Sequence, residues 1–143
     1  NNQKIYPYKY PGKYCTYTTQ NPSDQISNST VKSEILGASS YDKSRLNSIL
    51  STFGLQALVD KNPEELPFVI RKRINLASIL YDNKDIIIFD EPTLGQDNNF
   101  VIGLAMLINR MRLSGKVIIL ISHSSFFISQ LQNITTINLE KQH

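Results

Sequence analysis

The run Ile86-Ile-Ile-Phe89, followed at once by Asp90 and Glu91, constrains the fold of this chain more than any other segment. Consecutive apolar β-branched residues without alternation are typical of a buried strand in a parallel sheet. The run Val117 to Ile121 repeats the pattern and leads into His123. Open α/β sheets bind ligands at the carboxyl ends of their strands. We therefore expect a binding site where these strands end.

The remaining periodicity predicts helices that alternate with strands, an order that favours a parallel sheet. Apolar residues recur at helical spacing over 41–54, where Asp42 is the expected N-cap and Gly54 the expected stop. Arg71-Lys72-Arg73 is expected to form a solvated helix face that also favours a nucleotide electrostatically. Further helices are predicted over 56–60, 71–81, 100–112 and 126–132, and further strands over 14–19 and 134–139.

Composition limits the class of protein and its partners. The chain has 143 residues, of which 41% are hydrophobic and 19% charged, as in an ordinary globular domain. The net charge is +3 and the basic residues form no single block, which is a weak hint of an acidic partner and no more. We expect no nucleic-acid partner. Cys15 is the single cysteine, which suits a reducing compartment. No apolar stretch reaches the roughly 18–20 residues that span a bilayer, so a membrane role would require a partner.

Adjacent carboxylates at a strand end suit phosphate chemistry. One carboxylate can hold Mg²⁺, which prefers few protein oxygens and keeps several waters. The other can activate a water against a phosphate. Solvated charges in a simple turn are the alternative, which the following Pro92-Thr93 and Leu94-Gly95-Gln96-Asp97 disfavour.

Five segments, in this order and spacing, resemble the ATP-binding domain of ABC transporters, most closely that of energy-coupling-factor and cobalt/nickel-type importers. The resemblance covers roughly residues 14 to 140. The matching segments are Thr19-Gln20-Asn21-Pro22 (the Q-loop), Arg71 to Ala77 (the helix after the signature motif), Asp90-Glu91 (Walker B and the catalytic glutamate), Leu94-Gly95-Gln96-Asp97 (the D-loop) and Ile121-Ser122-His123 (the H-loop).

The resemblance implies an α/β fold: a P-loop NTPase-like parallel sheet flanked by helices, with a small helical subdomain inserted after the Q-loop. Residues 1–23 and 71–143 would form the catalytic core and residues 24–70 the helical subdomain. The implied activity is ATP hydrolysis at a dimer interface, which powers solute import. The implied location is cytoplasmic, peripheral on the inner face of the cell membrane.

The resemblance also implies a role for each matching residue. Asp90 would be the Mg²⁺ partner, Glu91 the catalytic base and His123 the sensor of the γ-phosphate of ATP. Gln20 would touch the metal and cofactor and couple the site to a transmembrane transporter subunit. Asp97 would bind the cofactor site of a second ATPase subunit.

The chain departs from the family pattern in two places. It contains no Gly-x-x-x-x-Gly-Lys-[Ser/Thr] Walker A loop, which should precede Gln20, and only 19 residues precede that glutamine. Where the family reads Leu-Ser-Gly-Gly-Gln, this sequence reads Leu66-Pro67-Phe68-Val69-Ile70, as if the signature had dropped out. Residues missing from the sequence as written, a fragment and a degenerate relative are the three open explanations.

These departures leave other functions open. Without the Walker A loop, the chain as written is expected to bind ATP poorly. A non-catalytic docking or regulatory module that keeps the fold is therefore the main alternative. A soluble ABC ATPase of translation or DNA repair is disfavoured, because Gly95-Gln96 stands where the translation group has Asn-His.

Overall fold

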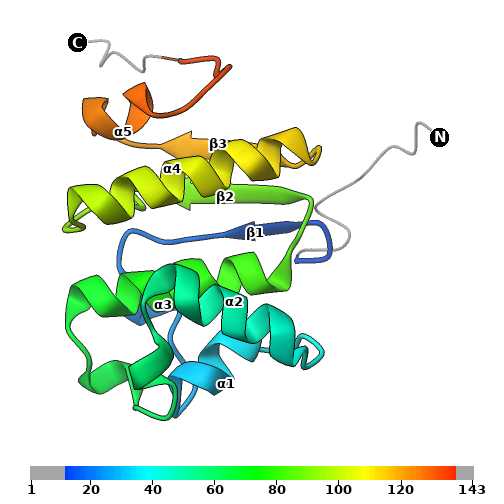
Figure 1. Cartoon of the computed structure of the whole chain (residues 1–143), viewed down its shortest axis with the longest axis vertical. Coiled ribbons are helices and arrows are strands. Elements are labelled where there is room, and N and C mark those ends of the chain that lie inside the picture. The colour runs from blue at the N-terminus through cyan, green and yellow to red at the C-terminus, as the bar shows by residue number, and fades with distance from the viewer. Residues whose placement is uncertain (1–11, 138–143) are drawn as a thin grey trace.

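The computed structural model describes residues 12–137, in which three strands form one parallel sheet. The strands are β1 (Cys15–Tyr17), β2 (Ile86–Asp90) and β3 (Val117–Ile121), in the order β1-β2-β3. In Figure 1 the three arrows point the same way, so the carboxyl ends share one edge. Asp90, the last residue of β2, lies opposite Ile121, the last residue of β3. The parallel sheet predicted from the sequence is confirmed.

Five α-helices accompany the sheet in the described part of the chain. They are α1 (Val31–Leu36), α2 (Lys43–Phe53), α3 (Phe68–Asp82), α4 (Asn98–Leu113) and α5 (Ser125–Ser129), with short 3₁₀ turns at Pro22–Asp24, Gln56–Leu58 and Pro63–Glu65. Helix α2 begins and ends as predicted. The Asp42 carboxylate accepts the Arg45 N–H at 3.0 Å, and Gly54 ends the helix in the left-handed conformation.

Two helices differ from the sequence prediction. Helix α3 begins at Phe68, directly after Pro67, instead of at Arg71. The segment in place of the signature motif is therefore partly helical. Helix α1 was not predicted, because it is only six residues long. It is stabilised by a capping box in which Thr30 and Ser33 each accept the other's backbone N–H.

The helices cover one face of the sheet. The connection from β1 to β2 and the connection from β2 to β3 each lead to the neighbouring strand, and both step across the sheet in the same direction. Because crossovers between parallel strands are right-handed, their helices lie on the same face of the sheet. On that side Ile87 and Phe89 are fully buried. On the other side Val117, Ile119 and Ile121 are each about half exposed, at 55%, 48% and 51%. The expectation that β3 is a buried strand is therefore wrong for this structure, in which no element covers its second face among residues 12–137.

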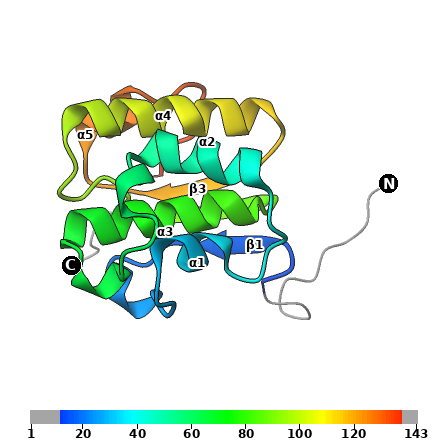
Figure 2. The ribbon, with the colours of Figure 1, turned by 60° about the horizontal axis from the view of Figure 1, so that its bottom comes forward.

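The core lies between the sheet and the helices. In Figure 2, α2 lies between α3 and α4, and the rings of Phe53 (α2) and Phe100 (α4) pack with centroids 5.8 Å apart. The buried apolar side chains form one cluster that includes Val31, Ile35, Leu46, Leu50, Phe53, Ile74, Leu76, Ile87, Phe89, Leu104, Ile108 and Phe127. The division into a core and a helical subdomain over 24–70 stays a prediction.

Residues 130–137, the described part of the chain after α5, contain no helix or strand. The strand predicted over 134–139 is wrong for residues 134–137, and residues 138 and 139 lie outside the described range. Ile134 is 44% exposed and Ile137 79% exposed, so neither side chain is buried as in a strand that packs in the core. No helix within residues 12–137 has both the length and the apolar character needed to cross a membrane.

Candidate functional site

Glu91 stands at a sharp turn directly after β2. Its φ is +43°, in the left-handed region that non-glycine residues rarely adopt. Such a conformation costs on the order of 1–3 kcal/mol and persists only where surrounding contacts hold it. The turn directs the chain from Asp90, at the end of the strand, into Pro92 and the D-loop segment.

The carboxylate of Glu91 is bound to the end of β3. Its Oε1 accepts the backbone N–H of His123 at 2.8 Å, and its Oε2 lies 3.4 Å from the Ser122 hydroxyl. The Glu91 backbone N–H donates to the Ile121 carbonyl at 3.0 Å. These contacts join two residues predicted to be catalytic, Glu91 and His123.

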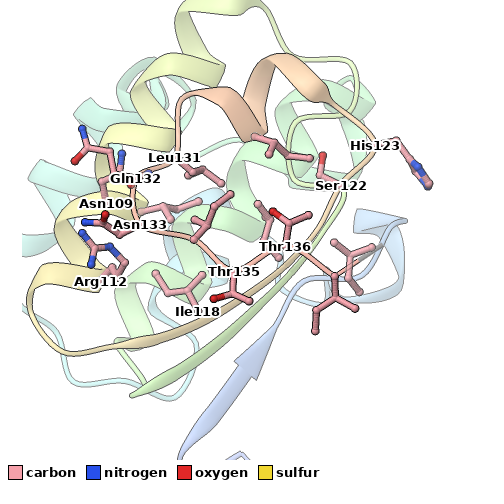
Figure 3. Close-up of a pocket in the computed structure, with 16 residues that line it drawn as sticks. Asn109, Arg112, Ile118, Ser122, His123, Leu131, Gln132, Asn133, Thr135 and Thr136 are labelled. Carbon is pink, nitrogen blue, oxygen red and sulfur yellow. Dashed lines mark hydrogen bonds between the residues drawn. The ribbon is translucent and has the colours of Figure 1, made fainter. Parts of the chain in front are cut away.

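The His123 imidazole projects from this edge into solvent. Its side chain is 98% exposed, and its Nε2 lies 3.8 Å from Oε1 of Glu91. Figure 3 shows the ring pointing away from the neighbouring cavity. The imidazole is therefore placed to contact a group that docks at the edge of the sheet while the backbone of the same residue holds Glu91.

Lys72 lies beneath this turn. It is only 3% exposed, and its ammonium donates to the backbone carbonyl of Glu91. Burial lowers the pKa of Lys72 from its ordinary value, and the negative charges of Glu91 and Asp90 oppose that shift. The expectation that Arg71-Lys72-Arg73 forms a solvated helix face is therefore wrong for Lys72, because α3 turns this side chain toward Asp90 and Glu91.

Asp90 is fixed by its backbone and leaves its carboxylate available. Its N–H donates to the hydroxyl of Thr18 at 2.9 Å, and the N–H of Thr18, which is buried, donates to the Ile88 carbonyl at 2.9 Å. Within residues 12–137 the Asp90 carboxylate accepts no hydrogen bond. A half-buried carboxylate with both oxygens available fits Mg²⁺, which is commonly bound through one or two carboxylates and substrate phosphates.

Gln20 lies on the turn after β1, near the same edge. Its side chain is exposed and forms no hydrogen bond among the described residues, so the structure does not join it to Asp90. Gln25 anchors the turn: its Nε2 donates to the Tyr17 carbonyl at 3.0 Å, and its Oε1 accepts the Thr19 N–H at 3.1 Å. The buried Asn75 of α3 donates to the Pro22 carbonyl at 3.1 Å.

Asp97 lies apart from the carboxylate pair. Its Oδ1 accepts the N–H of Phe100 at 3.0 Å and caps α4, and its Oδ2 forms an ion pair with Arg73 at 2.9 Å. The Phe100 N–H, followed by the charge of Arg73, lowers the pKa of Asp97. Gln96 also accepts from Arg73, at 2.8 Å, so α3 holds the D-loop segment from within the same chain.

Sequence reasoning missed three residues of this site: Thr18, Lys72 and Asn75. A signal for two of them was available in the helical period. Lys72 precedes the buried Leu76 by four residues and Ile79 by seven, which places it on the buried face of α3. Asn75 lies three residues after Lys72 on the same side. The role of Thr18 depends on strand pairing, which the sequence alone does not give.

A separate cavity of about 720 Å³ lies beside β3. Its walls come from α4, β3 and the segment after α5, and they include Ile118, Leu131 and Arg112 (Figure 3). His123 and Ser122 border it, and no carboxylate of residues 12–137 lines it. Asp90 and Glu91 therefore lie at the carboxyl edge of the sheet and outside the walls of this cavity.

Comparison with known proteins agrees with this geometry. An ABC transporter ATP-binding protein of Staphylococcus aureus (strain COL) is 32% identical over 135 residues, which are 87% of this chain and 23% of that protein. One of Clostridium tetani is 30% identical over 115 residues, 78% of this chain and 26% of that protein. The chain thus spans about a quarter of the length of these relatives.

Solved structures show the same fold. The ATP-binding subunit of an ABC transporter matches with a TM-score of 0.69 and 17% identity, over 81% of this chain and 52% of that one. The cbiO1 protein of Clostridium perfringens, described as part of the ABC transporter complex cbiONQ, matches with a TM-score of 0.55 and 25% identity, over 78% and 47%. The family model described as ABC transporter matches residues 1–94. The chain belongs to the ABC transporter family and has the P-loop NTPase-like fold of its ATP-binding domains.

Proposed function

We propose that this chain is the Q-loop to H-loop portion of an ATP-binding subunit that hydrolyses ATP to power solute import. The observation that carries the proposal is the meeting of Asp90, Glu91 and His123 at one edge of a parallel sheet. The Glu91 carboxylate lies 2.8 Å from the backbone nitrogen of His123 and 3.8 Å from its imidazole. Phosphoryl transfer needs mainly such positioning and charge neutralisation.

In this proposal the two carboxylates divide the work. Asp90, whose carboxylate is available, holds Mg²⁺, and the metal supplies charge neutralisation for the transferring phosphate. Glu91 orients the attacking water and accepts its proton. Its Oε2 is the oxygen suited to this task, because its only contact among the described residues is the long 3.4 Å one to Ser122. His123 donates from its exposed imidazole to the γ-phosphate.

The remaining predicted residues connect the site to partners. Gln20, on the exposed turn after β1, contacts the metal and couples the site to a transmembrane subunit. Asp97 contacts the site of a second ATPase subunit through its side chain, which is 60% exposed. The description of cbiO1 as part of an ABC transporter complex supports a transporter partner. With such a partner, the proposed place of this subunit is the inner face of the cell membrane.

The test is steady-state ATP hydrolysis by the protein at its natural length, together with equilibrium ATP binding. Glu91→Gln keeps the size of the side chain and removes the base, so turnover should fall by about 10²-fold or more while ATP affinity is retained. Glu64→Gln is the matched control, because Glu64 is exposed on the 3₁₀ turn Pro63–Glu65 and should leave turnover unchanged.

Two outcomes would contradict the proposal. Wild-type turnover in Glu91→Gln would remove Glu91 from the base role. Absence of ATP binding to the natural-length protein, even at millimolar ATP, would favour the docking or regulatory module over the ATPase.

A further inference from the structure

Lys72 is placed to control the geometry of Glu91 from below the turn. Three features coincide there: a buried ammonium, a backbone carbonyl that accepts from it, and a left-handed residue that carries this carbonyl. Glutamate has no local side-chain hydrogen bond that favours this conformation, unlike asparagine or aspartate. Contacts from elsewhere in the fold must therefore hold Glu91.

The other contacts of Glu91 come from the end of β3 and from its own turn. The Glu91 N–H is bound to Ile121, its carboxylate to His123, and its carbonyl also accepts the Leu94 N–H at a longer 3.3 Å. Among the described residues, Lys72 is the hydrogen-bond partner of Glu91 that belongs to α3. The Lys72 ammonium holds the backbone carbonyl of Glu91, while the chain that leaves β3 holds the Glu91 carboxylate.

We propose that Lys72 is a positioning residue that holds the Glu91 backbone in its left-handed conformation and thereby keeps the Glu91 carboxylate on the end of β3. This inference rests on the proposed function only for its effect on turnover. A buried lysine with a charged ammonium is costly unless it is hydrogen-bonded, and the Glu91 carbonyl is the acceptor that the structure provides. When that bond is removed, the turn is free to relax and the carboxylate leaves the His123 amide.

A comparable lysine–carbonyl contact, made by a half-buried lysine, occurs at the opposite edge of the sheet and supplies a control. The ammonium of Lys116 donates to the carbonyls of Asn83 at 3.0 Å and Lys84 at 2.8 Å. Asn83 is also left-handed, with φ +59°, and it precedes β2 as Glu91 follows it. Lys116→Met removes these lysine–carbonyl bonds at the end of the sheet opposite Asp90 and Glu91.

The first measurement is hydrogen exchange at the His123 backbone amide in the natural-length protein without nucleotide. This amide is protected by Oε1 of Glu91, so Lys72→Met should make it exchange at least about tenfold faster. Lys116→Met should leave it unchanged. If Lys72→Met does not fold, Lys72→Gln carries the test, because its shorter neutral amide also removes the ammonium.

The second measurement is ATP turnover. Displacement of a catalytic group can lower kcat by up to about 10²-fold, so kcat of Lys72→Met should fall by at least about tenfold while KM for ATP stays within about threefold. The double variant Lys72→Met/Glu91→Gln should be no slower than Glu91→Gln alone, since both act on one group.

The two proposals fail in different ways. An unchanged His123 exchange rate in a folded Lys72 variant overturns the positioning role, whatever the turnover. Full turnover in Glu91→Gln overturns the proposed function and leaves the exchange result standing. A Lys72→Met protein in which KM rises and kcat is unchanged also overturns the positioning role.

Discussion

The backbone nitrogen of His123 donates to Oε1 of Glu91 at 2.8 Å, so the residue after β2 is bound to the chain that leaves β3. The bond uses the main chain of His123 and leaves its imidazole in solvent. A side-chain substitution can therefore separate the bond to Glu91 from the ligand contact that we propose for the imidazole.

His123→Ala keeps the backbone N–H and removes the imidazole. Under the proposed function, turnover should fall by about 10²-fold or more, because a donor to the developing phosphate charge is lost. Exchange of the His123 amide should stay slow. Steady-state hydrolysis and hydrogen exchange measure the two effects separately. Ser122→Ala removes the 3.4 Å contact to Glu91 and the hydroxyl that accepts the Ser124 N–H at 3.1 Å, but it keeps the imidazole and should keep turnover within about threefold. Wild-type turnover in His123→Ala would exclude the imidazole from the reaction.

Thr18→Val tests the bond between β1 and the Asp90 backbone. The substitution removes the buried hydroxyl that accepts the Asp90 N–H at 2.9 Å, and the unsatisfied donor should lower the free energy of unfolding by about 1–3 kcal/mol. Thr18→Ser keeps the hydroxyl and should cost less, because it removes only a methyl group. Urea unfolding of both variants decides this, and equal stabilities of Thr18→Val and Thr18→Ser would contradict the assigned hydrogen bond.

Asp97 should contribute a pH-dependent part of the stability. Its pKa in the folded chain is lowered below the ordinary 3.8 by the Phe100 N–H and by Arg73. The stabilisation is therefore fully present above pH 3.8 and is lost as the pH falls through the lower, folded-state pKa. In urea unfolding between neutral pH and the acid limit, Asp97→Asn should show a shallower loss of stability than the wild type.

The control for Asp97 is the other aspartate that caps a helix. Asp42 accepts the Arg45 N–H at 3.0 Å and forms no ion pair among the described residues, so Asp42→Asn removes a charge without breaking a salt bridge. Ionic strength separates the two sites further, because salt screens the charge of both caps but only Asp97 also has the ion pair with Arg73 to lose. An identical salt response of both variants would argue against that ion pair.

Leu104→Ala and Leu113→Ala compare the two sides of α4. Leu104 is 3% exposed and belongs to the core, whereas Leu113 is 74% exposed at the end of the helix. The buried substitution should lower the free energy of unfolding by about 2–5 kcal/mol. The exposed one should change it by no more than about 0.5 kcal/mol. Chemical denaturation measures both, and similar losses would contradict the packing of α4 on the sheet.

The fold could be predicted largely from apolar periodicity. The runs Ile86–Phe89 and Val117–Ile121 each form strands, because their β-branched residues suit extended backbone and the segment between them is long enough for a crossover helix. Helix α1 could not be found this way. It has six residues, and its stability depends on the Thr30–Ser33 capping box and on packing against α3 rather than on a long apolar stripe.

The residues of the candidate site that could be predicted are those that lie at or just after the end of a strand. Asp90, Glu91 and His123 were expected near one another because parallel strands end at one edge, and the structure brings them there. The Gln20 side chain is exposed and forms no hydrogen bond among the described residues, so its position relative to Asp90 does not follow from the sheet. Lys72 was misjudged because three consecutive basic residues suggest solvent, whereas the helical phase shared with Leu76 decides its burial.

The exposed face of β3 affects how residues 12–137 should behave in solution. β3 is an edge strand of the described sheet, so the N–H and C=O groups along its outer side have no neighbouring strand. Val117, Ile119 and Ile121 add an exposed apolar surface. Strands with both properties template addition of further strands. Residues 12–137 produced by themselves should precipitate or form oligomers, and Ile119→Lys, a charge placed within this strand, should keep them dispersed.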